Sequence, residues 1–268
     1  MPRNSLARVQ LSPLLLFLGS TCGVIAFTWP LFLPNSNFVL LQASSARLLA
    51  IVVAAFGIAL VALEISRGAM DSKSVALLGV LSALIAALRL VGAGAIGIEP
   101  MWFLLILAGH VYGKYFGFSL GVISMAVSAL LTGGIGPWLP FQMIAAGWIG
   151  LLAGFAASKV TPAFERFYLI ILGILSSLGF GLLMDLQLWP WLTSTDTQLS
   201  FVPGAGIAEN WERFLVFHLT TALAWDIPRA LTTALLIALT AKPILNSLKR
   251  ARTRLNFTSH VTVQKAIV

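Results

Sequence analysis

The sequence predicts an all-α integral membrane protein of about eight transmembrane helices. Hydrophobic residues make up 59% of its 268 residues and charged residues only 10%, whereas a soluble globular domain carries about 25% charged residues. Several apolar runs exceed the roughly 18 residues that mark a membrane-spanning helix. Because a segment in lipid must satisfy its backbone polar groups internally, we interpret these runs as helices.

The first two helices are expected within residues 1–73, as an N-terminal extension. The first apolar run, residues 11–33, is too long for the core of a signal peptide and has no clear cleavage site, so we interpret it as a retained helix. It contains the single cysteine, Cys22. One cysteine excludes an internal disulfide and a CxxC site, and we expect a small packing residue. The second helix is expected over residues 46–64.

Six further helices are expected in a core over residues 74–250. The shortest of them is followed by the turn at Gly113, and the segment 99–117 forms either two full spans or a re-entrant hairpin. A basic tail, residues 251–268, follows the core. We see no internal repeat of the kind that marks many secondary transporters. The six core helices are expected over residues 74–91, 99–112, 118–131, 141–158, 167–188 and 213–241.

The charges are distributed unequally between the two sides of this topology. The net charge is +8, and the cations lie mainly in alternate loops and in the C-terminal segment that begins at Lys249. This is the positive-inside pattern, which predicts a multi-pass plasma-membrane protein with both termini in the cytoplasm. No basic stripe along a soluble surface points to nucleic acid.

The first core helix carries a face of small residues. Gly79, Ala83 and Ala87 are spaced four apart, which allows another helix to approach closely in lipid. The spacing alone does not distinguish docking to a partner protein from packing within the chain.

Two groups of residues near the predicted outer surface are candidates for ligand binding. Arg89 and Glu99 are ionisable groups near the membrane, where such residues are paired or functional; they form either a structural pair or ligand contacts. Trp138 and Gln142 lie four apart in a Gly- and Pro-rich junction and suit a flat ligand with a polar edge, or an ordinary turn with an interfacial tryptophan.

The remaining candidates are tryptophans and one charged pair. Trp102 and Trp189 belong to a group of six tryptophans near the outer boundary, which form either an aromatic belt or part of an aromatic site. Asp226 and Arg229 lie three apart on one face of the last helix, and we expect a charge-compensated structural pair. Participation in a polar path is the alternative.

Motifs typical of enzymes are weak. Residues 117–121 match the G-x-S-x-G pattern around Ser119, but that nucleophile needs a strand-to-helix turn, and His110 and His218 have no supporting motif. Residues 109–115 resemble a P-loop that is one residue short and ends in tyrosine. We see no zinc motif. We therefore expect no catalytic activity, no cofactor and no metal site.

Residues 74–250 resemble the substrate-binding S component of an energy-coupling factor (ECF) vitamin transporter, in particular its actinobacterial, corrinoid-linked members. The most specific match is the run Gly-Pro-Trp-x-Pro-x-Gln-Met, which begins at Gly136. The helix of small residues with Arg89, the segment 107–113 and the pair Trp225-Asp226 add to it. Residues 1–73 would then be an addition to a six-helix core.

The resemblance implies a binding subunit that captures a vitamin or precursor at the outer face and has no ATPase of its own. Its partners would be a transmembrane coupling protein, docked on Gly79, Ala83 and Ala87, and two ATP-binding subunits. Cobalamin or another corrinoid is the first expected cargo, and riboflavin- or thiamin-like compounds remain open. The candidate ligand-binding residues are Arg89, Glu99, Trp102, Trp138, Gln142 and Trp189.

Two other classes of function compete with this one. An autonomous, ion-coupled carrier would transport without partners and could use Asp226 as a proton relay. A membrane-embedded enzyme would use Ser119 or Asp226.

Overall fold

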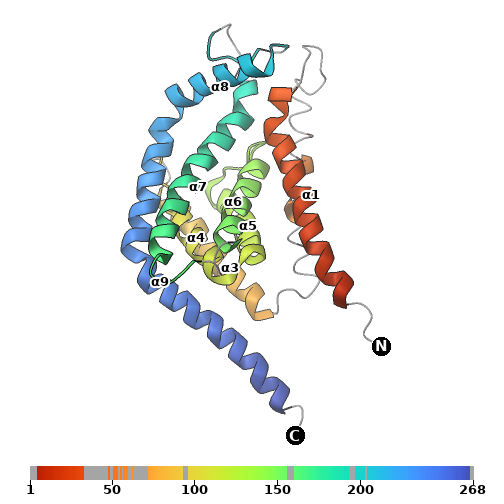
Figure 1. The fold of residues 1–268 in the computed structure, drawn as a ribbon, viewed down its shortest axis with the longest axis vertical. Coiled ribbons are helices and arrows are strands. Elements are labelled where there is room, and N and C mark those ends of the chain that lie inside the picture. Colours follow the sequence, from red (N-terminus) through yellow and green to blue (C-terminus); the bar gives the residue numbers. More distant parts are fainter. Residues whose placement is uncertain are drawn as a thin grey trace.

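The fold is a bundle of helices, and no strand occurs in the part of the chain that the structure describes (Figure 1). The structure is a computed structural model. It describes residues 5–32, isolated positions between 48 and 62, and residues 72–92, 96–155, 160–192, 197–202 and 204–265. The all-α expectation is confirmed. The elements are α1 (Ser5–Phe32), α3 (Ser72–Val91), α4 (Met101–Tyr112), α5 (Lys114–Thr132), α6 (Leu139–Phe155), α7 (Glu165–Leu188), the 3₁₀ turn η2 (Trp189–Trp191), α8 (Ile207–Thr221) and α9 (Leu223–Lys265).

The two ends of the bundle differ. The start of α1 and the end of α9 lie together at one end, which we call the terminal end (Figure 1). Helix α8 lies across the opposite end, which we call the α8 end. Helices α3, α5 and α7 run from the terminal end to the α8 end, so the loops that follow them gather there.

Among the described residues, four helices are long and apolar enough to cross a membrane by length and composition. They are Ser72–Val91, Lys114–Thr132, Glu165–Trp191 and the first part of α9, Leu223–Arg254. Three apolar helices are shorter: Leu16–Trp29, Met101–Tyr112 and Leu139–Phe155. Most of the predicted second helix, residues 46–64, lies outside the described residues.

Helix α4 is short and runs antiparallel to α5. Its 12 residues span about 18 Å, less than the roughly 30 Å of a hydrocarbon core. The loop before it contacts Arg229 of α9 through Glu99, and at its other end the Tyr112 hydroxyl donates to the Leu248 carbonyl at 3.1 Å. Helix α4 therefore runs alongside α9, and α5 returns from the terminal end. This arrangement favours two passes over a re-entrant hairpin.

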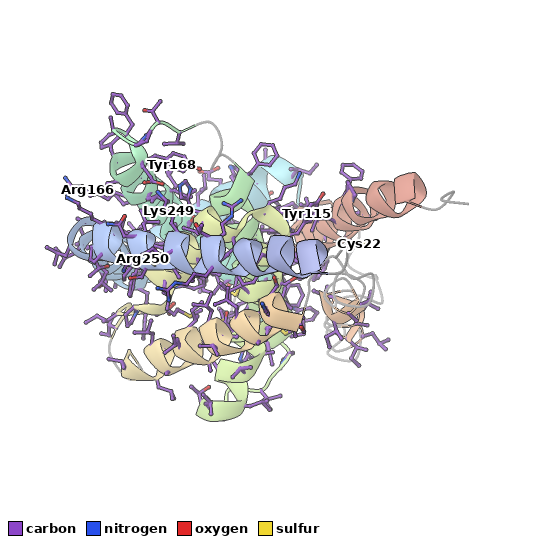
Figure 2. The ribbon with its side chains drawn as sticks, turned by 90° about the horizontal axis from the view of Figure 1, so that it is seen from below. Cys22, Tyr115, Arg166, Tyr168, Lys249 and Arg250 are labelled. Atoms are coloured by element: carbon purple, nitrogen blue, oxygen red, sulfur yellow. The ribbon has the colours of Figure 1, made fainter. Side chains whose placement is uncertain are left out.

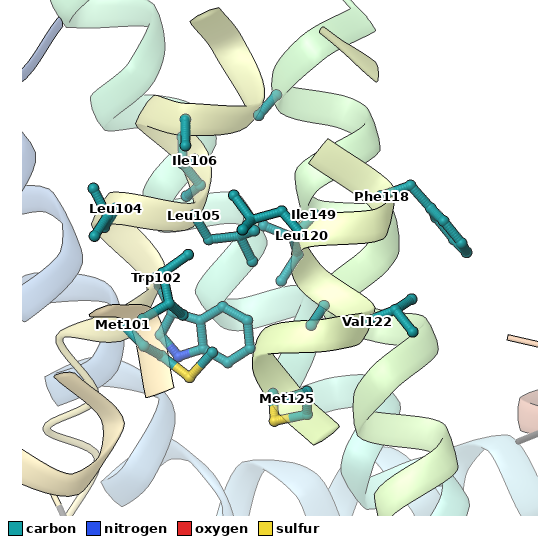
Figure 3. Close-up of a cluster of buried hydrophobic side chains, with 14 of the residues drawn as sticks. Met101, Trp102, Leu104, Leu105, Ile106, Phe118, Leu120, Val122, Met125 and Ile149 are labelled. Carbon is teal, nitrogen blue, oxygen red and sulfur yellow. The ribbon is translucent and has the colours of Figure 1, made fainter. Parts of the chain in front are cut away.

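Helix α4 is also the centre of the bundle. Every residue from Met101 to Val111 is buried, because α4 packs against α3, α5, α6, α7 and α9. Large side chains from α5 and α6 close around it, including Leu120, Met125 and Ile149 (Figure 3). A helix that is apolar on all sides is expected in such a position.

The G-x-S-x-G pattern is a packing motif. It lies inside α5, where a Cβ atom on Gly117 or Gly121 would overlap the backbone of α6 at Gly150 or Ala146. Ser119 is fully buried within the bundle. The strand-to-helix turn that a nucleophilic serine needs is therefore not formed here. The P-loop-like run is likewise the junction of α4 and α5, where Gly113 has a φ of +96°.

Helix α1 packs on α6 and α7, away from the small-residue face of α3. The Trp148 indole N–H donates to the Ser20 hydroxyl at 3.1 Å, and the rings of Phe27 and Phe141 meet edge to face with centroids 5.2 Å apart. The small-residue face itself is exposed at all three positions, and a Cβ on Gly79 would meet nothing within 4 Å. Among the described residues, this face makes no close intrachain helix contact.

The last predicted helix, 213–241, is wrong in extent and number. Helix α8 begins earlier, at Ile207, and α8 and α9 meet at a break at Ala222. Helix α9 then continues to Lys265, so most of the predicted tail is helical. The break has no Gly or Pro to mark it, and the segment 249–254 that leads into the tail is rich in Lys and Arg, which are good helix formers.

Candidate ligand site and buried charge network

Arg89, Ser128 and Gln142 come together towards the α8 end of the bundle. Arg89 lies in the last turn of α3, Ser128 in the second-last turn of α5 and Gln142 in the first turn of α6. The Arg89 guanidinium donates from Nη1 to Ser128 Oγ at 2.7 Å and from Nη2 to Gln142 Oε1 at 3.3 Å. We call these three residues the Arg89 cluster. Two of them, Arg89 and Gln142, were singled out from the sequence.

The Arg89 cluster is rich in hydrogen-bond donors. A guanidinium carries five N–H donors in a planar fork, and an amide that accepts through its oxygen still has an NH₂ group to donate. Ser128 also donates to the Met125 carbonyl at 2.9 Å, which fixes its hydroxyl within α5. Such a cluster can donate to carbonyl, hydroxyl or phosphate oxygens of a ligand.

Trp138 lies next to this cluster in the chain, in the loop before α6. Its side chain is 43% exposed, and its ring lies over Gly136, where a Cβ would overlap the ring atoms. Its carbonyl accepts from the backbone N–H of Gln142 at 3.0 Å and so begins the helix that carries the amide. An exposed indole is thus linked by one helical turn to the Arg89 cluster.

Glu99 bonds to Arg229 and Trp102. The Arg229 Nε donates to Glu99 Oε2 at 3.2 Å, and the Trp102 indole N–H donates to the same oxygen at 2.7 Å. Arg89 and Glu99 therefore do not bond to each other, which was the structural alternative expected from the sequence. Arg89 bonds to neutral partners on α5 and α6, and Glu99 ties the start of α4 to α9.

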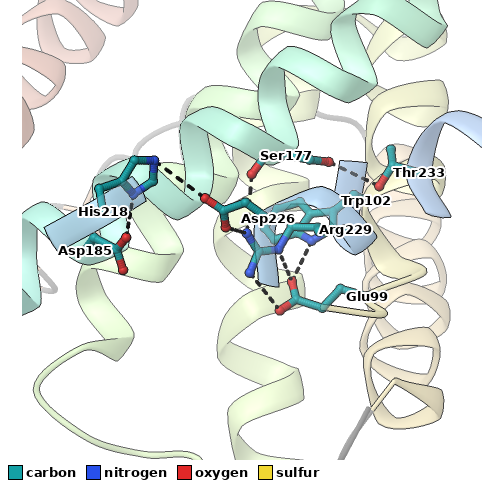
Figure 4. A network of polar contacts seen from close by, with 8 residues as sticks. All are labelled: Glu99, Trp102, Ser177, Asp185, His218, Asp226, Arg229 and Thr233. Carbon is teal, nitrogen blue, oxygen red and sulfur yellow. Dashed lines mark hydrogen bonds and ion pairs between the residues drawn. The ribbon is translucent and has the colours of Figure 1, made fainter. Parts of the chain in front are cut away.

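Asp226 and Arg229 form a buried ion pair, with 2.6 Å between Oδ1 and Nη1. His218 of α8 extends it into the network of Figure 4: its Nδ1 lies 2.6 Å from Asp185 Oδ2 on α7, and its Nε2 lies 3.9 Å from Asp226 Oδ2. The network thus connects α7, α8, α9 and the loop before α4. A buried charge pair of this kind needs such partners, because removal from water is costly.

Asp185 and His218 were not singled out as a pair by sequence reasoning. They are 33 residues apart and come from different helices, so no spacing rule joins them. The available signal was chemical. Ionisable residues inside apolar helices are rare and usually paired, so an aspartate in α7 and a histidine in α8 should each have prompted a search for a partner.

Trp102 and Trp189 are core residues. Each is only 1% exposed. The Trp189 indole N–H donates to the Leu199 carbonyl at 2.7 Å, and its ring packs on Phe201 and Phe214. Trp189 therefore holds the segment before α8 in place, and Trp102 holds Glu99. Neither side chain offers a free face to a ligand in this arrangement.

The described residues contain no group of three or more His, Cys, Asp or Glu side chains that could hold a metal ion. The polar groups that the structure describes at the α8 end offer hydrogen bonding and charge, from the Arg89 cluster and the network around Arg229.

Comparison with known proteins identifies a family. No curated protein and no solved structure matches significantly. Residues 69–208 match a family model described as "ECF-type riboflavin transporter, S component". The description names riboflavin, so it supports the resemblance to S components and does not support the corrinoid-linked subgroup. Because the match covers just over half of the chain and includes α3 to α7 and the Arg89 cluster, the chain belongs to the family of ECF-type riboflavin transporter S components.

Proposed function

We propose that this chain captures a vitamin at the α8 end and delivers it inward together with a coupling protein and two ATP-binding subunits. The observation that carries the proposal is the family match, which makes the chain a membrane-embedded substrate-binding subunit of an ECF importer. The Arg89 cluster and Trp138 then supply donors and a stacking surface at the same end of the bundle.

The cargo we propose is riboflavin or a closely related flat vitamin. The family description names riboflavin. A planar ring system with carbonyl groups at one edge fits a stacking indole and an arginine–amide pair better than a bulky corrinoid does. Cobalamin and cobinamide are the second candidates, on the sequence resemblance alone.

The orientation that we propose places the terminal end in the cytoplasm. The described loops and helix ends there carry Lys73, Lys114, Arg166 and the cations of α9, whereas Glu209 and Glu212 lie on α8. This is the positive-inside arrangement. The α8 end, with the Arg89 cluster, then faces outward.

The docking face that we propose for the coupling protein is the exposed row of Gly79, Ala83 and Ala87 on α3. Small residues allow close helix contact in lipid, and this row is open along the outside of the bundle. Helix α1 packs on the α6 side and does not cover it.

A thermal-shift screen of the purified chain tests the cargo. The panel contains riboflavin, thiamin, cobalamin and cobinamide. A ligand at a hundredfold its Kd stabilises the native state by about 2.7 kcal/mol, which is measurable. A shift with riboflavin, lost in Arg89→Ala and in Trp138→Ala, supports the proposal. A shift with a corrinoid alone would make a corrinoid the cargo in place of riboflavin. If no vitamin shifted the unfolding of a folded, monodisperse sample, vitamin capture would be contradicted.

Uptake in reconstituted vesicles separates the competing classes. An S component requires ATP and its partners, so the chain alone should give no concentrative uptake under an ion gradient. Uptake by the chain alone, abolished in Asp226→Asn, would indicate an autonomous carrier.

A further inference from the structure

One face of α9 at the terminal end combines cations with polar side chains. Its five residues follow the pattern i, i+3, i+4, i+7 and i+8, so they lie on the same side of the helix. All five are exposed and together line one shallow hollow. Figure 2 shows α9 lying across the terminal end, with Lys249 and Arg250 on it. We call this the basic face: Asn246, Lys249, Arg250, Thr253 and Arg254.

The basic face continues an apolar stripe of the same helix. Leu231, Leu235 and Leu239 are exposed at 59–70% and lie four apart. The next exposed position on that side, three residues and about 4.5 Å further along the axis, is Lys242. The surface thus changes from leucine to cation within one helical turn. A helix surface that passes from acyl chains to headgroups shows this change.

The opposite side of α9 fixes the basic face to the bundle. Leu245 and Leu248 are buried, and Arg252 Nη1 donates to the Val111 carbonyl at 2.8 Å. The Lys249 ammonium lies 2.7 Å from Glu165, so this cation is already compensated. Arg250, in contrast, bonds to a neutral hydroxyl, Ser247 Oγ, at 3.2 Å. The helix is therefore held in place while it presents a net positive surface.

We infer that the basic face binds the phosphate headgroup of an anionic phospholipid. Guanidinium groups match phosphate oxygens in geometry as well as charge, and a hydroxyl and an amide beside them add hydrogen bonds. A lipid is favoured over a soluble anion or an acidic protein because the leucine stripe leads directly into the face. The site lies at the opposite end of the bundle from the Arg89 cluster, and its test does not depend on the identity of the vitamin.

The test measures lipid association of the full chain. The protein is titrated in phosphatidylcholine nanodiscs with increasing phosphatidylglycerol, and bound lipid is counted by native mass spectrometry after gentle release. The test variant is Arg250→Gln/Arg254→Gln. The matched control is Lys73→Gln/Arg166→Gln, which removes two exposed cations from the same end without touching α9.

A charge-assisted hydrogen bond to phosphate contributes about tenfold in affinity, so the test variant, which loses two guanidinium donors at the site, should require at least tenfold more phosphatidylglycerol for half-occupancy. The control should stay within twofold of the wild type. An equal loss of lipid binding in both variants would show that net charge alone determines it, and would overturn the proposed site. Equal binding by inorganic phosphate, or unchanged lipid binding with lost association to the coupling module, would overturn the assignment to lipid.

Discussion

Glu99 and Arg229, 130 residues apart in the chain, are joined by an ion pair of 3.2 Å between Oε2 and Nε. Arg229 also compensates Asp226, so one guanidinium balances two carboxylates from the loop before α4 and from α9. Because Arg229 connects elements at the α8 end, its replacement should lower the stability of the whole bundle.

Replacing Arg229 by glutamine should lower the free energy of unfolding by about 3–5 kcal/mol, because two buried or half-buried carboxylates lose their counter-charge. Thermal unfolding in detergent measures the change. The control is Arg213→Gln, which breaks the exposed Arg213–Glu209 pair and should cost less than about 1 kcal/mol. Equal effects of the two substitutions would contradict a structural role for Arg229.

A methyl group on Gly181 should disrupt the same network. In α7 a Cβ at this position would overlap both carboxylate oxygens of Asp226. We therefore expect Gly181→Ala to destabilise the protein by about 2–3 kcal/mol, as overpacking in a full core does.

Gly179 is the matched control for Gly181, since it lies in the same helix and a Cβ there meets nothing within 4 Å. Gly179→Ala should be neutral or stabilising by up to about 1 kcal/mol, because alanine is the better helix former. Equal changes in thermal stability for Gly181→Ala and Gly179→Ala would contradict the close contact between Asp226 and α7.

Ser128 should matter for ligand affinity through its bond to Arg89. Removing the hydroxyl frees one side of the guanidinium, and the loss of a hydrogen bond of this kind costs about 1–1.5 kcal/mol. We expect Ser128→Ala to weaken binding of the vitamin identified in the screen by about five- to tenfold. Isothermal titration calorimetry measures the change.

Ser124 supplies the control for Ser128. It is a buried serine one turn away in α5, and its hydroxyl donates to the Gly121 carbonyl within the same helix at 3.1 Å. Ser124→Ala should leave vitamin affinity unchanged. Equal loss in both variants would assign the effect to the packing of α5, and not to the Arg89 cluster.

The sequence was sufficient for the elements with long apolar runs. The helix expected over residues 74–91 is α3, which begins two residues earlier, and the helix expected over 167–188 is α7. A long apolar run in lipid must satisfy its backbone hydrogen bonds internally, so hydropathy alone predicts a helix there. The ends were less well predicted where polarity and helix propensity disagree. Helix α9 passes through its basic segment as a helix, and the break at Ala222 has no local signal.

Local spacing predicted local contacts and missed distant ones. The Asp226–Arg229 pair is formed within one helical turn, as its spacing indicated. Arg89 and Gln142 were recognised separately, yet their bond, and Ser128 between them, depend on how three helices are placed. Trp102 and Trp189 were expected near the outer boundary, in an aromatic belt or in an aromatic site, and both are buried, which is a tertiary property that sequence position does not give.

The exposed small-residue face of α3 leads to a prediction about assembly. A larger side chain at Gly79 has room within the chain, because a Cβ there meets no atom within 4 Å. Gly79→Leu should therefore preserve thermal stability and vitamin binding. It should reduce co-purification with the coupling protein at least tenfold, because close helix contact in lipid needs small residues.

The control is Leu84→Phe, which adds bulk at an exposed position on a different side of α3 and should leave assembly unchanged. Co-purification from cells that express all subunits, with a vitamin-binding measurement on the isolated chain, gives both readouts. Loss of vitamin binding in Gly79→Leu would show that the residue acts within the chain. Retained assembly would place the coupling protein on another surface, for which the exposed leucines of α9 would be the next to substitute.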